Sequence, residues 1–387
     1  MNLSLQIAFW FCLFLIVYSY AVYPIALLLL SKIHLKTRIR NANRLPSVSF
    51  VIAAYNEQDV IENKLRNCLS MNYPKTKIEF LIGSDHSTDG TDTLVRRFAR
   101  RHRRIRLFAF PLREGKAYVM NKIVPRAKGD ILVFSDANTL YHADSVRRMV
   151  SHFADAGVGG VCGKLVLVNP NDNTGGQGET LYWNYENLVK RLEGRIRTVF
   201  GATGGIYAIR KRLFQPLPRS RTSINDDFLI PMRIIAKGFD VVYDDKAKAR
   251  EFVSYSAQDE FRRKVRIGTG NVFTFIHILP LLHPRHGFIA FGLWSHKIIR
   301  WAVPFLMALL FLLNVGLLGM PFFRWVFGFQ VLFYLCAFAG WLVDRRGKTL
   351  KPLSICFYFV GINLALLIGY VNYFTGSIPP AWDRLER

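Results

Sequence analysis

Long apolar segments occur near both ends of the chain and set its overall plan. Residues 7–30 contain no charged side chain over 24 positions. As an α-helix this segment would be about 36 Å long, which exceeds the roughly 30 Å of hydrocarbon in a bilayer. Three similar segments lie near the C-terminus, at residues 298–318, 322–343 and 353–374. We therefore expect one N-terminal and three C-terminal transmembrane helices.

A cleaved signal peptide is the alternative interpretation of residues 7–30. It is disfavoured because no basic residues precede the segment, the apolar run is too long and no small-residue cleavage site follows. Loops rich in Lys and Arg stay on the cytoplasmic side of a membrane, so basic residues indicate the orientation. They follow the first segment and separate the last two: Lys32, Lys36, Arg38, Arg40 and Arg44, then Arg345, Arg346, Lys348 and Lys351. Four crossings then put both termini outside and residues 44–298 in the cytoplasm, beneath what we expect to be a bacterial inner membrane.

The segment between the membrane helices alternates short β-branched runs with amphipathic stretches. This alternation predicts an α/β domain with a mainly parallel sheet. The expected strands are residues 47–53, 78–83, 105–110, 130–135, 158–168, 204–210 and 240–243. The expected helices are residues 58–72, 91–104, 116–126, 143–156, 179–195 and 226–237.

The pattern changes again after this domain. Residues 259–277 mix basic and aromatic side chains and are interrupted by Gly268 and Gly270. Such a segment is typical of a helix that lies in the membrane interface. The predicted organisation is an N-terminal transmembrane helix with a basic juxtamembrane segment (1–44), a cytoplasmic α/β domain (45–258), amphipathic interface helices (259–297) and three transmembrane helices (298–387).

Composition adds a strong positive charge but no metal or disulfide framework. The 52 Lys and Arg against 27 Asp and Glu give a net charge of +25. Nucleic acid is one possible partner for such a chain, but much of the excess is juxtamembrane or lies in residues 96–106, which carry seven Arg and no acid. That distribution favours anionic lipid or a polyanion, or a merely solvated helix face. The five cysteines have no metal-ligand spacing.

Polar motifs directly follow three of the predicted strands. Asn56 lies in VIAAYNE, Asp85 in SDHSTDGT and Asp136 in FSDANT. Ligands of open α/β sheets bind beyond the carboxyl ends of the strands, where these side chains should gather. The arrangement favours a nucleotide, with a divalent cation held by the acidic groups. The plain structural alternative is that Asn56, Asp89 and Asp136 cap the helices or turns that follow.

These motifs, together with FGATGGIYAIRK and NDDFLIPMR, resemble family 2 glycosyltransferases in their order and approximate spacing. The chain is most similar to the membrane-integrated group that includes cellulose, chitin, hyaluronan and poly-N-acetylglucosamine synthases. The resemblance implies a GT-A-type, Rossmann-like domain with transmembrane helices, a UDP-sugar donor, and Mg²⁺ or Mn²⁺. It implies no role for nucleic acid.

The resemblance also assigns roles to individual residues. It places Tyr55 and Glu57 beside the nucleotide base and ribose, Asp85 on the uracil ring and Lys116 near the diphosphate or the rim of the base. Asp136 and Asn138 occupy the DxD position and would hold the metal, although Asn138 is a neutral ligand where the family usually has a carboxylate. Thr203 and Gly204, with Gly205, would form the wall beside the transferred sugar, or would instead relieve packing between a strand and a helix.

The acidic pair Asp226 and Asp227 matches the catalytic pair of the family. Asp227 would be the general base that takes the proton of the acceptor hydroxyl, with Asp226 in support. The alternative is that both acids simply favour a helix N-terminus. The acceptor signature of polymerising members, Gln-x-x-Arg-Trp, falls at residues 263–267. Arg266 occupies the Arg position, but Arg263 replaces the usual Gln and Ile267 the usual Trp.

We therefore expect an inverting glycosyltransferase that acts on a growing polysaccharide or a lipid-linked saccharide at the membrane. Transfer to polyprenyl phosphate is the enzymatic alternative. A non-catalytic polysaccharide-binding subunit is the other, because Ser84, Asn138 and Ile267 depart from the family pattern.

Overall fold

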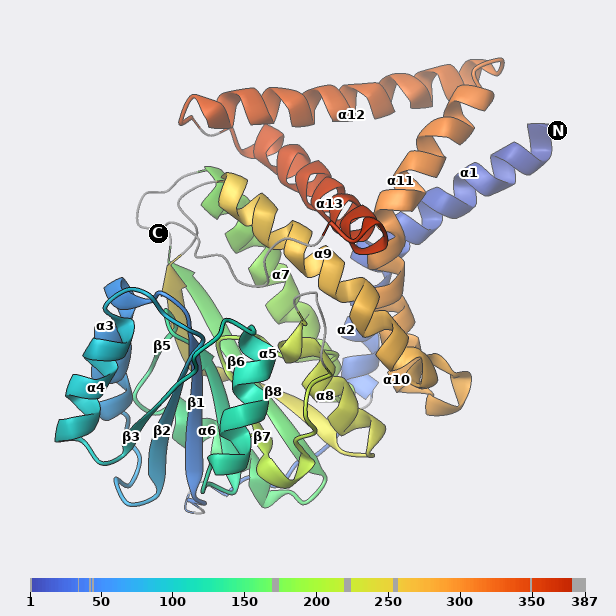
Figure 1. The fold of residues 1–387 in the computed structure, drawn as a ribbon. Helices are drawn as coiled ribbons and strands as arrows, with labels where there is room; N and C mark the ends of the chain where they lie inside the picture. The colour runs from blue at the N-terminus through green and yellow to red at the C-terminus, as the bar shows by residue number, and fades with distance from the viewer. Residues whose placement is uncertain are drawn as a thin grey trace.

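The computed structural model describes residues 2–33, 35–41, 43, 45–168, 174–218, 224–252, 257–348 and 350–377. Arg44, which belongs to the predicted basic loop, lies outside these ranges. Figure 1 shows an α/β domain below and long helices above it.

The strands are β1 (Val48–Ala54), β2 (Ile78–Ser84), β3 (Ile105–Ala109), β4 (Ile131–Asp136), β5 (Leu140–Tyr141), β6 (Val158–Val168), β7 (Tyr207–Arg210) and β8 (Asp240–Phe252). The helices that pack on them are α3 (Gln58–Leu69), α4 (Thr91–Arg101), α5 (Lys116–Ile123), α6 (Ser145–Ser151), α7 (Thr174–Ile196) and α8 (Asp226–Ala236). The remaining helices are α1 (Asn2–Val17), α2 (Tyr23–Ile33), α9 (Ala257–Ile278), α10 (Phe288–Gly292), α11 (Ile299–Gly316), α12 (Pro321–Arg345) and α13 (Lys351–Thr375). Two π-helical turns, η1 (Tyr18–Val22) and η7 (Leu293–Ile298), join α1 to α2 and α10 to α11.

The strands form one mixed sheet in the order β3-β2-β1-β4-β7-β6-β8-β5. Strands β3, β2, β1 and β4 run parallel, and β6 runs parallel to β8, whereas β7 is antiparallel to both of its neighbours. The prediction of a mainly parallel sheet is therefore confirmed for its first half. Strand β5, which pairs antiparallel with β8, was not predicted.

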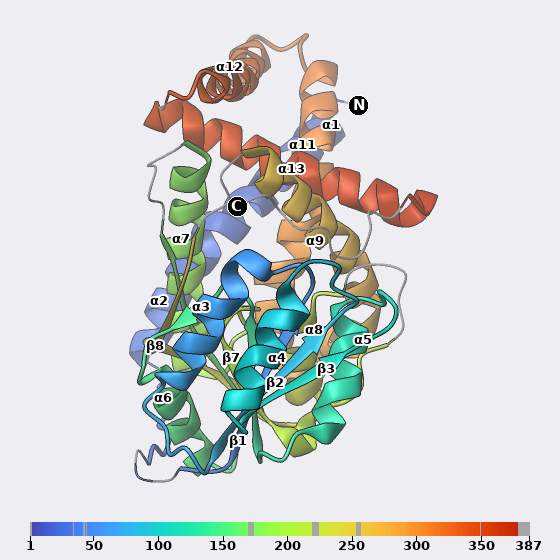
Figure 2. The ribbon, with the colours of Figure 1, turned by 60° about the vertical axis from the view of Figure 1, so that its left-hand side comes forward.

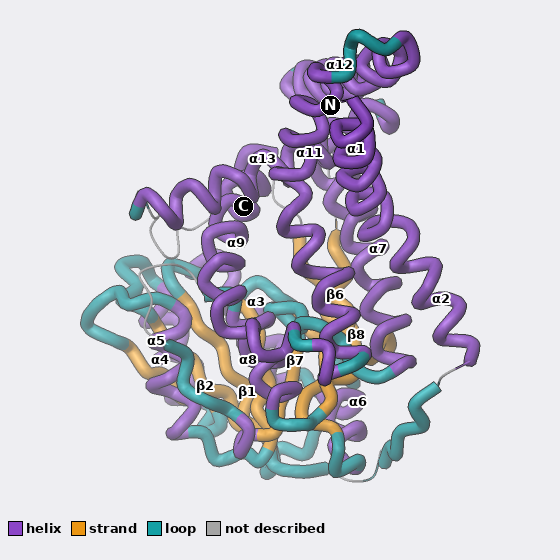
Figure 3. The backbone as a smooth tube through the Cα atoms, turned by 90° about the vertical axis from the view of Figure 1, so that its right-hand side faces the viewer, coloured by secondary structure: helices purple, strands orange, loops and turns teal. Residues whose placement is uncertain are grey.

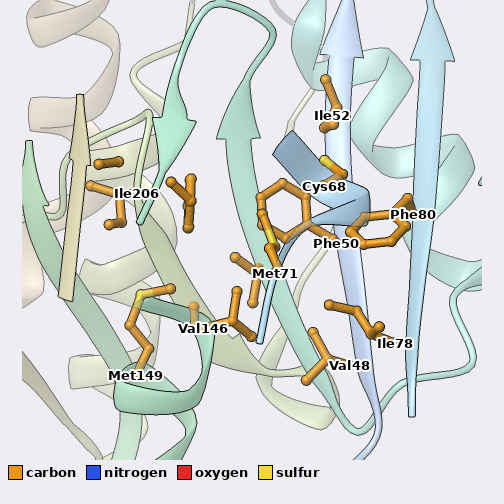
Figure 4. Packing of buried hydrophobic residues seen from close by; sticks show 14 of the residues in the cluster. Val48, Phe50, Ile52, Cys68, Met71, Ile78, Phe80, Val146, Met149 and Ile206 are labelled. Carbon is orange, nitrogen blue, oxygen red and sulfur yellow. The ribbon is translucent and has the colours of Figure 1, made fainter. Parts of the chain in front are cut away.

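Every side chain of β1 is buried, because helices cover both faces of the sheet. On one face Phe50 packs against Phe80 of β2 with ring centroids 5.8 Å apart, beneath α3, α4 and α6 (Figure 4). On the other face Val51 belongs to a second cluster with α5, α8 and the segment around α10. The second core therefore joins the sheet to the segment around α10.

The described residues include five helical segments long and apolar enough to cross a membrane: Leu3–Ile33, Gln258–Leu282, Phe288–Gly316, Pro321–Arg345 and Lys351–Thr375. Three of them contain the predicted segments 7–30, 322–343 and 353–374, and Phe288–Gly316 covers all but the last two residues of the predicted segment 298–318. The long helices indicate membrane integration. Helix α1 lies along α11, and α13 crosses α9 (Figures 2 and 3).

The segment Gln258–Leu282 contains the predicted interface helix, and it corrects one detail of that prediction. Gly268 does not interrupt α9, which is continuous. A Cβ at Gly268 would lie 2.9 Å from the backbone oxygen of Leu366, so the glycine instead permits close contact with α13. Thr269 strengthens this crossing by donating a hydrogen bond of 3.1 Å to the carbonyl oxygen of Gly369.

Candidate active site

The parallel strands bring the predicted nucleotide-binding motifs to one edge of the sheet. In the register of the sheet, Ala54 of β1 lies opposite Ser84 of β2, and Ala53 lies opposite Asp136 of β4. The residues that follow these strands, Tyr55 and Asp85, therefore lie at the same edge as Asp136, as the sequence predicts.

Asp85 is fully buried and holds the loop that leads into α5. Its Oδ1 accepts a hydrogen bond from the backbone N–H of Glu114 and its Oδ2 one from that of Gly115, both at 2.8 Å. The loop turns at Gly115, whose φ is 89°, a conformation that favours glycine. A carboxylate can accept about four hydrogen bonds, so contact with a nucleotide base stays a prediction compatible with this role.

The predicted base site contains a stacked pair of side chains. The exposed Arg113 guanidinium lies 3.9 Å from the centre of the half-buried Tyr55 ring. Arg on an aromatic face forms a flat cationic surface suited to a nucleotide base. Glu57 is half-buried beside it at the start of α3, where its N–H donates to Thr91 Oγ1 at 2.8 Å.

The capping alternatives have different outcomes. Asn56 does not cap α3, because its Oδ1 accepts from the N–H of Thr88. Asp89 instead joins the starts of two helices. Its Oδ1 accepts from Thr91 at the start of α4 and its Oδ2 accepts from Gln58 at the start of α3. Asp89 therefore has the structural role that the sequence suggested.

Lys116 links the acidic residues of two distant motifs. Its Nζ lies 3.0 Å from Asp136 Oδ1 and 3.1 Å from Asp226 Oδ1. Burial alone would lower the pKa of Lys116, but Asp136 and Asp226 outweigh it and raise the pKa well above its ordinary value. Asp226 is buried and its Oδ2 also accepts from the hydroxyl of Tyr207 at 2.8 Å. Asp226 therefore fixes the centre of the site together with Lys116.

Asp227 faces Asp136 across the backbone of Gly204. A Cβ on Gly204 would lie 3.4 Å from Asp227 Oδ2 and 3.7 Å from Asp136 Oδ2, so the glycine leaves a gap between two carboxylates. The carbonyl oxygen of Asp227 accepts from the N–H of Ala202 at 2.7 Å, which fixes α8 against this wall. Burial and the neighbouring Asp226 carboxylate raise the pKa of Asp227 to about 6. A carboxylate with such a pKa can accept a proton near neutral pH.

The neighbouring wall residues have distinct contacts. Thr203 is buried, and its Oγ1 accepts from Lys190 Nζ at 2.8 Å. A Cβ on Gly205 would lie 2.6 Å from Thr139 Oγ1, so Gly205 serves packing rather than the gap beside Asp227. The two alternatives for these glycines thus apply to different residues: Gly204 faces the acidic gap and Gly205 relieves packing.

A divalent cation fits this arrangement only with help from a ligand. No group of three or more His, Cys, Asp or Glu that could hold a metal occurs in the described part of the chain. Asp136 and Asn138 are both half-buried at the end of β4, and the gap over Gly204 exposes Oδ2 of Asp136. One or two protein oxygens completed by substrate phosphates is the usual arrangement for Mg²⁺, and these residues are compatible with it.

The two predicted acceptor-site arginines lie in different surroundings on α9. Arg263 donates from Nε to Glu260 Oε2 at 2.6 Å. Arg266 is close enough to three carboxylates to interact electrostatically with them, namely those of Asp136, Asp226 and Asp227. Of the two arginines, Arg266 is therefore the one whose charge acts on this acidic cluster.

A cavity of about 460 Å³ extends from Asp227 to the membrane helices. Its walls come from α7, α8, α9, η7, α11 and α13, with Tyr20 of η1. Figure 1 shows α7 and α9 beneath α13, around this region. The lining includes Trp183, Lys190, Phe228, Lys264, Ile267, Lys297, Arg300, Trp301, Phe359 and Leu366. Asp227 therefore lines the same cavity as residues of α13, a helix long and apolar enough to cross a membrane.

Sequence reasoning missed two buried lysines of the site. Lys190 lies in this cavity wall. Lys64 of α3 contacts the residues on either side of Asp136 and Asn138. Lys64 is fully buried and donates to Ser135 Oγ at 2.6 Å and to the carbonyl oxygen of Thr139. Burial lowers the pKa of Lys64 to about 8. Nothing in the local pattern separates either residue from an ordinary lysine on a helix surface.

Comparisons with known proteins agree with this geometry. Residues 49–217 match the family described as Glycosyl transferase family 2. The glycosyltransferase AglE of Haloferax volcanii is 31% identical over 159 residues, covering 40% of this chain and 52% of its own length. The poly-β-1,6-N-acetyl-D-glucosamine synthase of Staphylococcus aureus is 25% identical over 236 residues, covering 59% of this chain and 56% of its own. The chain thus spans about half the length of the curated relatives that it matches.

The overall fold also resembles a solved structure over nearly the entire length of both chains. The mannosyltransferase PcManGT from Pyrobaculum calidifontis, solved with GDP-mannose and Mn²⁺, superposes with a TM-score of 0.73. The alignment covers 96% of this chain and 97% of that protein at 19% identity. This likeness establishes the fold, a GT-A-like α/β domain with long apolar helices.

Residues 49–217 of this chain match glycosyltransferase family 2, and the relatives named above are glycosyltransferases. The predicted family, fold class and enzyme class are therefore confirmed. The convergence of Lys116, Asp136, Asp226 and Asp227 gives the non-catalytic alternative no structural support.

Proposed function

We propose that the protein is an inverting glycosyltransferase that moves a hexose or N-acetylhexosamine from a UDP-sugar to a hydroxyl group of a growing polysaccharide or lipid-linked saccharide. The observation that carries this proposal is the position of Asp227. Its Oδ2 borders the gap over Gly204, faces Asp136 and opens onto the membrane-directed cavity. The proposed location is the cytoplasmic membrane face, in keeping with the basic residues that follow the first helix.

In the proposed reaction, the acceptor oxygen attacks the anomeric carbon from the face opposite the nucleotide. Asp227 takes the hydroxyl proton as the new carbon–oxygen bond forms. The bond between the anomeric carbon and the diphosphate oxygen breaks, and UDP leaves with the electron pair. Lys116 offers a positive charge near the departing diphosphate, and Asp226 holds Lys116 in place.

Asp136 and Asn138 would hold Mg²⁺ or Mn²⁺ together with the diphosphate. The cation would neutralise negative charge that develops on the leaving group. Tyr55 with Arg113, and Asp85 with Glu57, would contact the uracil and ribose. Thr203 and Gly204 would border the transferred sugar.

A panel of UDP- and GDP-sugars tests this function in membranes that contain the full chain. Release of UDP together with a product of inverted anomeric configuration, analysed for linkage, would support it. Turnover of GDP-sugars alone would contradict the proposed donor. Product without inversion would contradict the role of Asp227.

Transfer to polyprenyl phosphate is a second candidate, because the cavity reaches a membrane-spanning helix. In that reaction a phosphate oxygen would attack the anomeric carbon and would need no general base. Parallel assays with saccharide acceptors and with polyprenyl phosphate separate the two. Product formed only with polyprenyl phosphate would replace the main proposal.

A further inference from the structure

The cavity beside Asp227 has more positive than negative charge in its walls. Four cationic side chains line it, Lys190, Lys264, Lys297 and Arg300, against the carboxylates of Glu186 and Asp227. Charges taken out of water are costly unless they are paired. How these cations are matched therefore indicates what the cavity is built to receive.

Arg300 and Lys264 already have carboxylate partners. Arg300 pairs with Glu186 Oε1 and also donates to the hydroxyl of Tyr185 at 2.6 Å. Lys264 Nζ lies 3.3 Å from Glu260 Oε1. Burial would raise the pKa of Glu186, but His296, Lys297 and Arg300 together lower it well below its ordinary value. These groups form a compensated frame around the cavity.

Lys190 has no carboxylate partner at such short range, although its charge acts on Asp227 and lowers the pKa of that carboxyl. It is only 4% exposed, and its Nζ donates to the carbonyl oxygen of Ala202 at 3.1 Å and to Thr203 Oγ1 at 2.8 Å. Both partners are neutral, and among the described residues Lys190 has no carboxylate within ion-pair distance. The ring of Trp183 covers the same ammonium at 5.6 Å. A buried cation held by neutral groups beside a cavity is a ready site for an anion.

Lys297 supplies a second cation that is only weakly matched. Its nearest carboxylate oxygen, Glu186 Oε2, lies 3.8 Å away and is shared with His296 Nε2 at 3.2 Å. Glu186 therefore balances several positive groups at once. Among the residues that line the cavity, Lys190 and Lys297 are therefore the cations that no carboxylate matches at close range.

The opposite wall of the cavity is apolar and belongs to a membrane helix. Ile355, Phe359, Ile362 and Leu366 of α13 make most of it, beside Tyr358 and Asn363. Lys351–Thr375 is long and apolar enough to cross a bilayer. An inorganic anion or a soluble sugar phosphate has no hydrocarbon part to bury against this surface. An amphiphile with an anionic head and a hydrocarbon chain would match both walls.

We propose that this cavity binds the phosphate or diphosphate headgroup of a lipid-linked acceptor, with Lys190 and Lys297 contacting phosphate oxygens and the lipid chain against α13. The inference rests on the proposed function, because it takes Asp227 as the place where the acceptor reacts. If the acceptor is a lipid-linked saccharide, its sugar hydroxyl lies at Asp227. If the acceptor is polyprenyl phosphate, the phosphate itself lies there.

Binding can be tested without turnover, with the full chain in lipid nanodiscs. The ligands are long-chain polyprenyl phosphate, polyprenol of the same length and inorganic phosphate. We expect polyprenyl phosphate to bind at least about tenfold more tightly than either of the others, the effect of one well-formed charge-assisted contact. Equal binding of polyprenol would overturn the phosphate site, and equal binding of inorganic phosphate would overturn the lipid requirement.

Variants then assign the site to its residues. Lys190→Met and Lys297→Met should each weaken polyprenyl phosphate binding about tenfold or more, while Lys190→Arg should retain most of it. Lys75→Met, at an exposed loop position, is the matched control. Thermal unfolding reports whether each variant is folded. If Lys190→Met does not fold, Lys190→Arg and Lys297→Met still decide, and wild-type affinity in Lys297→Met would contradict the proposal.

Failure of the proposed lipid site and failure of the proposed sugar transfer can be told apart. Asp227→Asn should still bind polyprenyl phosphate, because its change removes no cation. Binding without any sugar transfer would leave the lipid site standing and contradict the proposed reaction. Transfer to a saccharide without lipid phosphate binding would do the reverse.

Discussion

Two acidic pairs of the catalytic domain have opposite electrostatic surroundings. Asp240 and Asp244 lie on β8 and are matched by cations and a histidine, whereas Asp226 and Asp227 begin α8 and share the nearby Lys116. Burial would raise the pKa of Asp244, but His152 and Arg40 lower it to about 2. The pKa of Asp227 is raised to about 6. Matched carboxylates hold the structure together, and an incompletely matched one is available for proton transfer.

The matched pair also explains how the first membrane helix is attached to the sheet domain. Lys36 and Arg38, which follow α2, both pair with Asp240 Oδ2. Arg40 lies 3.4 Å from Asp244 Oδ2. The basic residues that predict membrane orientation therefore also form ion pairs with β8.

The most severe test concerns Asp227, the incompletely matched carboxylate, and is the variant Asp227→Asn. It keeps the size of the side chain but removes the base, so we expect sugar transfer to a hydroxyl acceptor to fall about 10²- to 10⁴-fold. Turnover is measured as UDP release with linkage analysis, and UDP affinity should change little.

Asp130→Asn is the matched control, since Asp130 is exposed at the opposite end of β4. Its turnover should equal that of the wild type. Full activity of Asp227→Asn toward a saccharide would remove Asp227 from the mechanism. Full activity only toward polyprenyl phosphate would favour the acceptor that needs no base.

The second test fills the gap between the carboxylates. In Gly204→Ala the new methyl group meets Asp227 Oδ2 at an ordinary 3.4 Å, so the fold should tolerate it. The methyl group would nevertheless occupy space beside the reacting sugar. We expect kcat/KM to fall about 10- to 100-fold, with an unchanged thermal unfolding temperature.

Gly205→Ala is the neighbouring comparison. Its methyl group would lie 2.6 Å from Thr139 Oγ1, so overpacking should lower the free energy of unfolding by about 1–3 kcal/mol. If Gly205→Ala lost activity without losing stability, or Gly204→Ala did the reverse, the assignment of the two glycines would be wrong.

The sequence predicts the acidic pair that begins α8 better than the pair on β8. Asp226 and Asp227 stand at a recognisable helix start. The motifs before them follow strands whose bounds the apolar pattern predicts closely, such as Ile78–Ser84. Strand β8 was expected to end at residue 243 but continues to Phe252. Its second half alternates charged residues with alanine, a weak strand former, so the local pattern conceals a strand that pairing with β6 stabilises.

The lysines of the site were beyond prediction for a related reason. Lys190 belongs to a helix that the periodicity does predict, but its surroundings depend on how α7 meets α9 and α13. Those contacts join segments far apart in the chain. Sequence periodicity identifies a buried face and does not say which cavity that face borders.

The pH dependence of turnover sharpens the comparison further. Asp227 must be ionised to accept a proton, so kcat should fall about tenfold per pH unit below a pH of about 6. Its folded-state pKa lies above the ordinary value, so the folded chain binds a proton more tightly, and this contribution to stability is lost as the pH rises through about 6. A pH–rate profile in nanodiscs measures the limb.

Lys116→Met provides the control for that limb, because the charge of Lys116 lowers the pKa of Asp227. The residual activity of this variant should fall off at a higher pH than that of the wild type. A limb that stays in place, or a wild-type profile that is flat down to pH 4, would show that another group limits the rate.

The smallest effect on transfer is expected from the matched pair itself. In Asp244→Asn the buried His152 loses a charged partner at 2.9 Å, and the free energy of unfolding should fall by about 1–3 kcal/mol at neutral pH, with kcat unchanged. The folded-state pKa of Asp244 is lowered, so its contribution is present above its ordinary pKa and is lost as the pH falls toward about 2. The difference between wild type and variant in thermal unfolding should therefore shrink in acid. If the variant kept its stability but lost kcat, the carboxylates of β8 would affect catalysis. The division between structural and catalytic carboxylates would then be wrong.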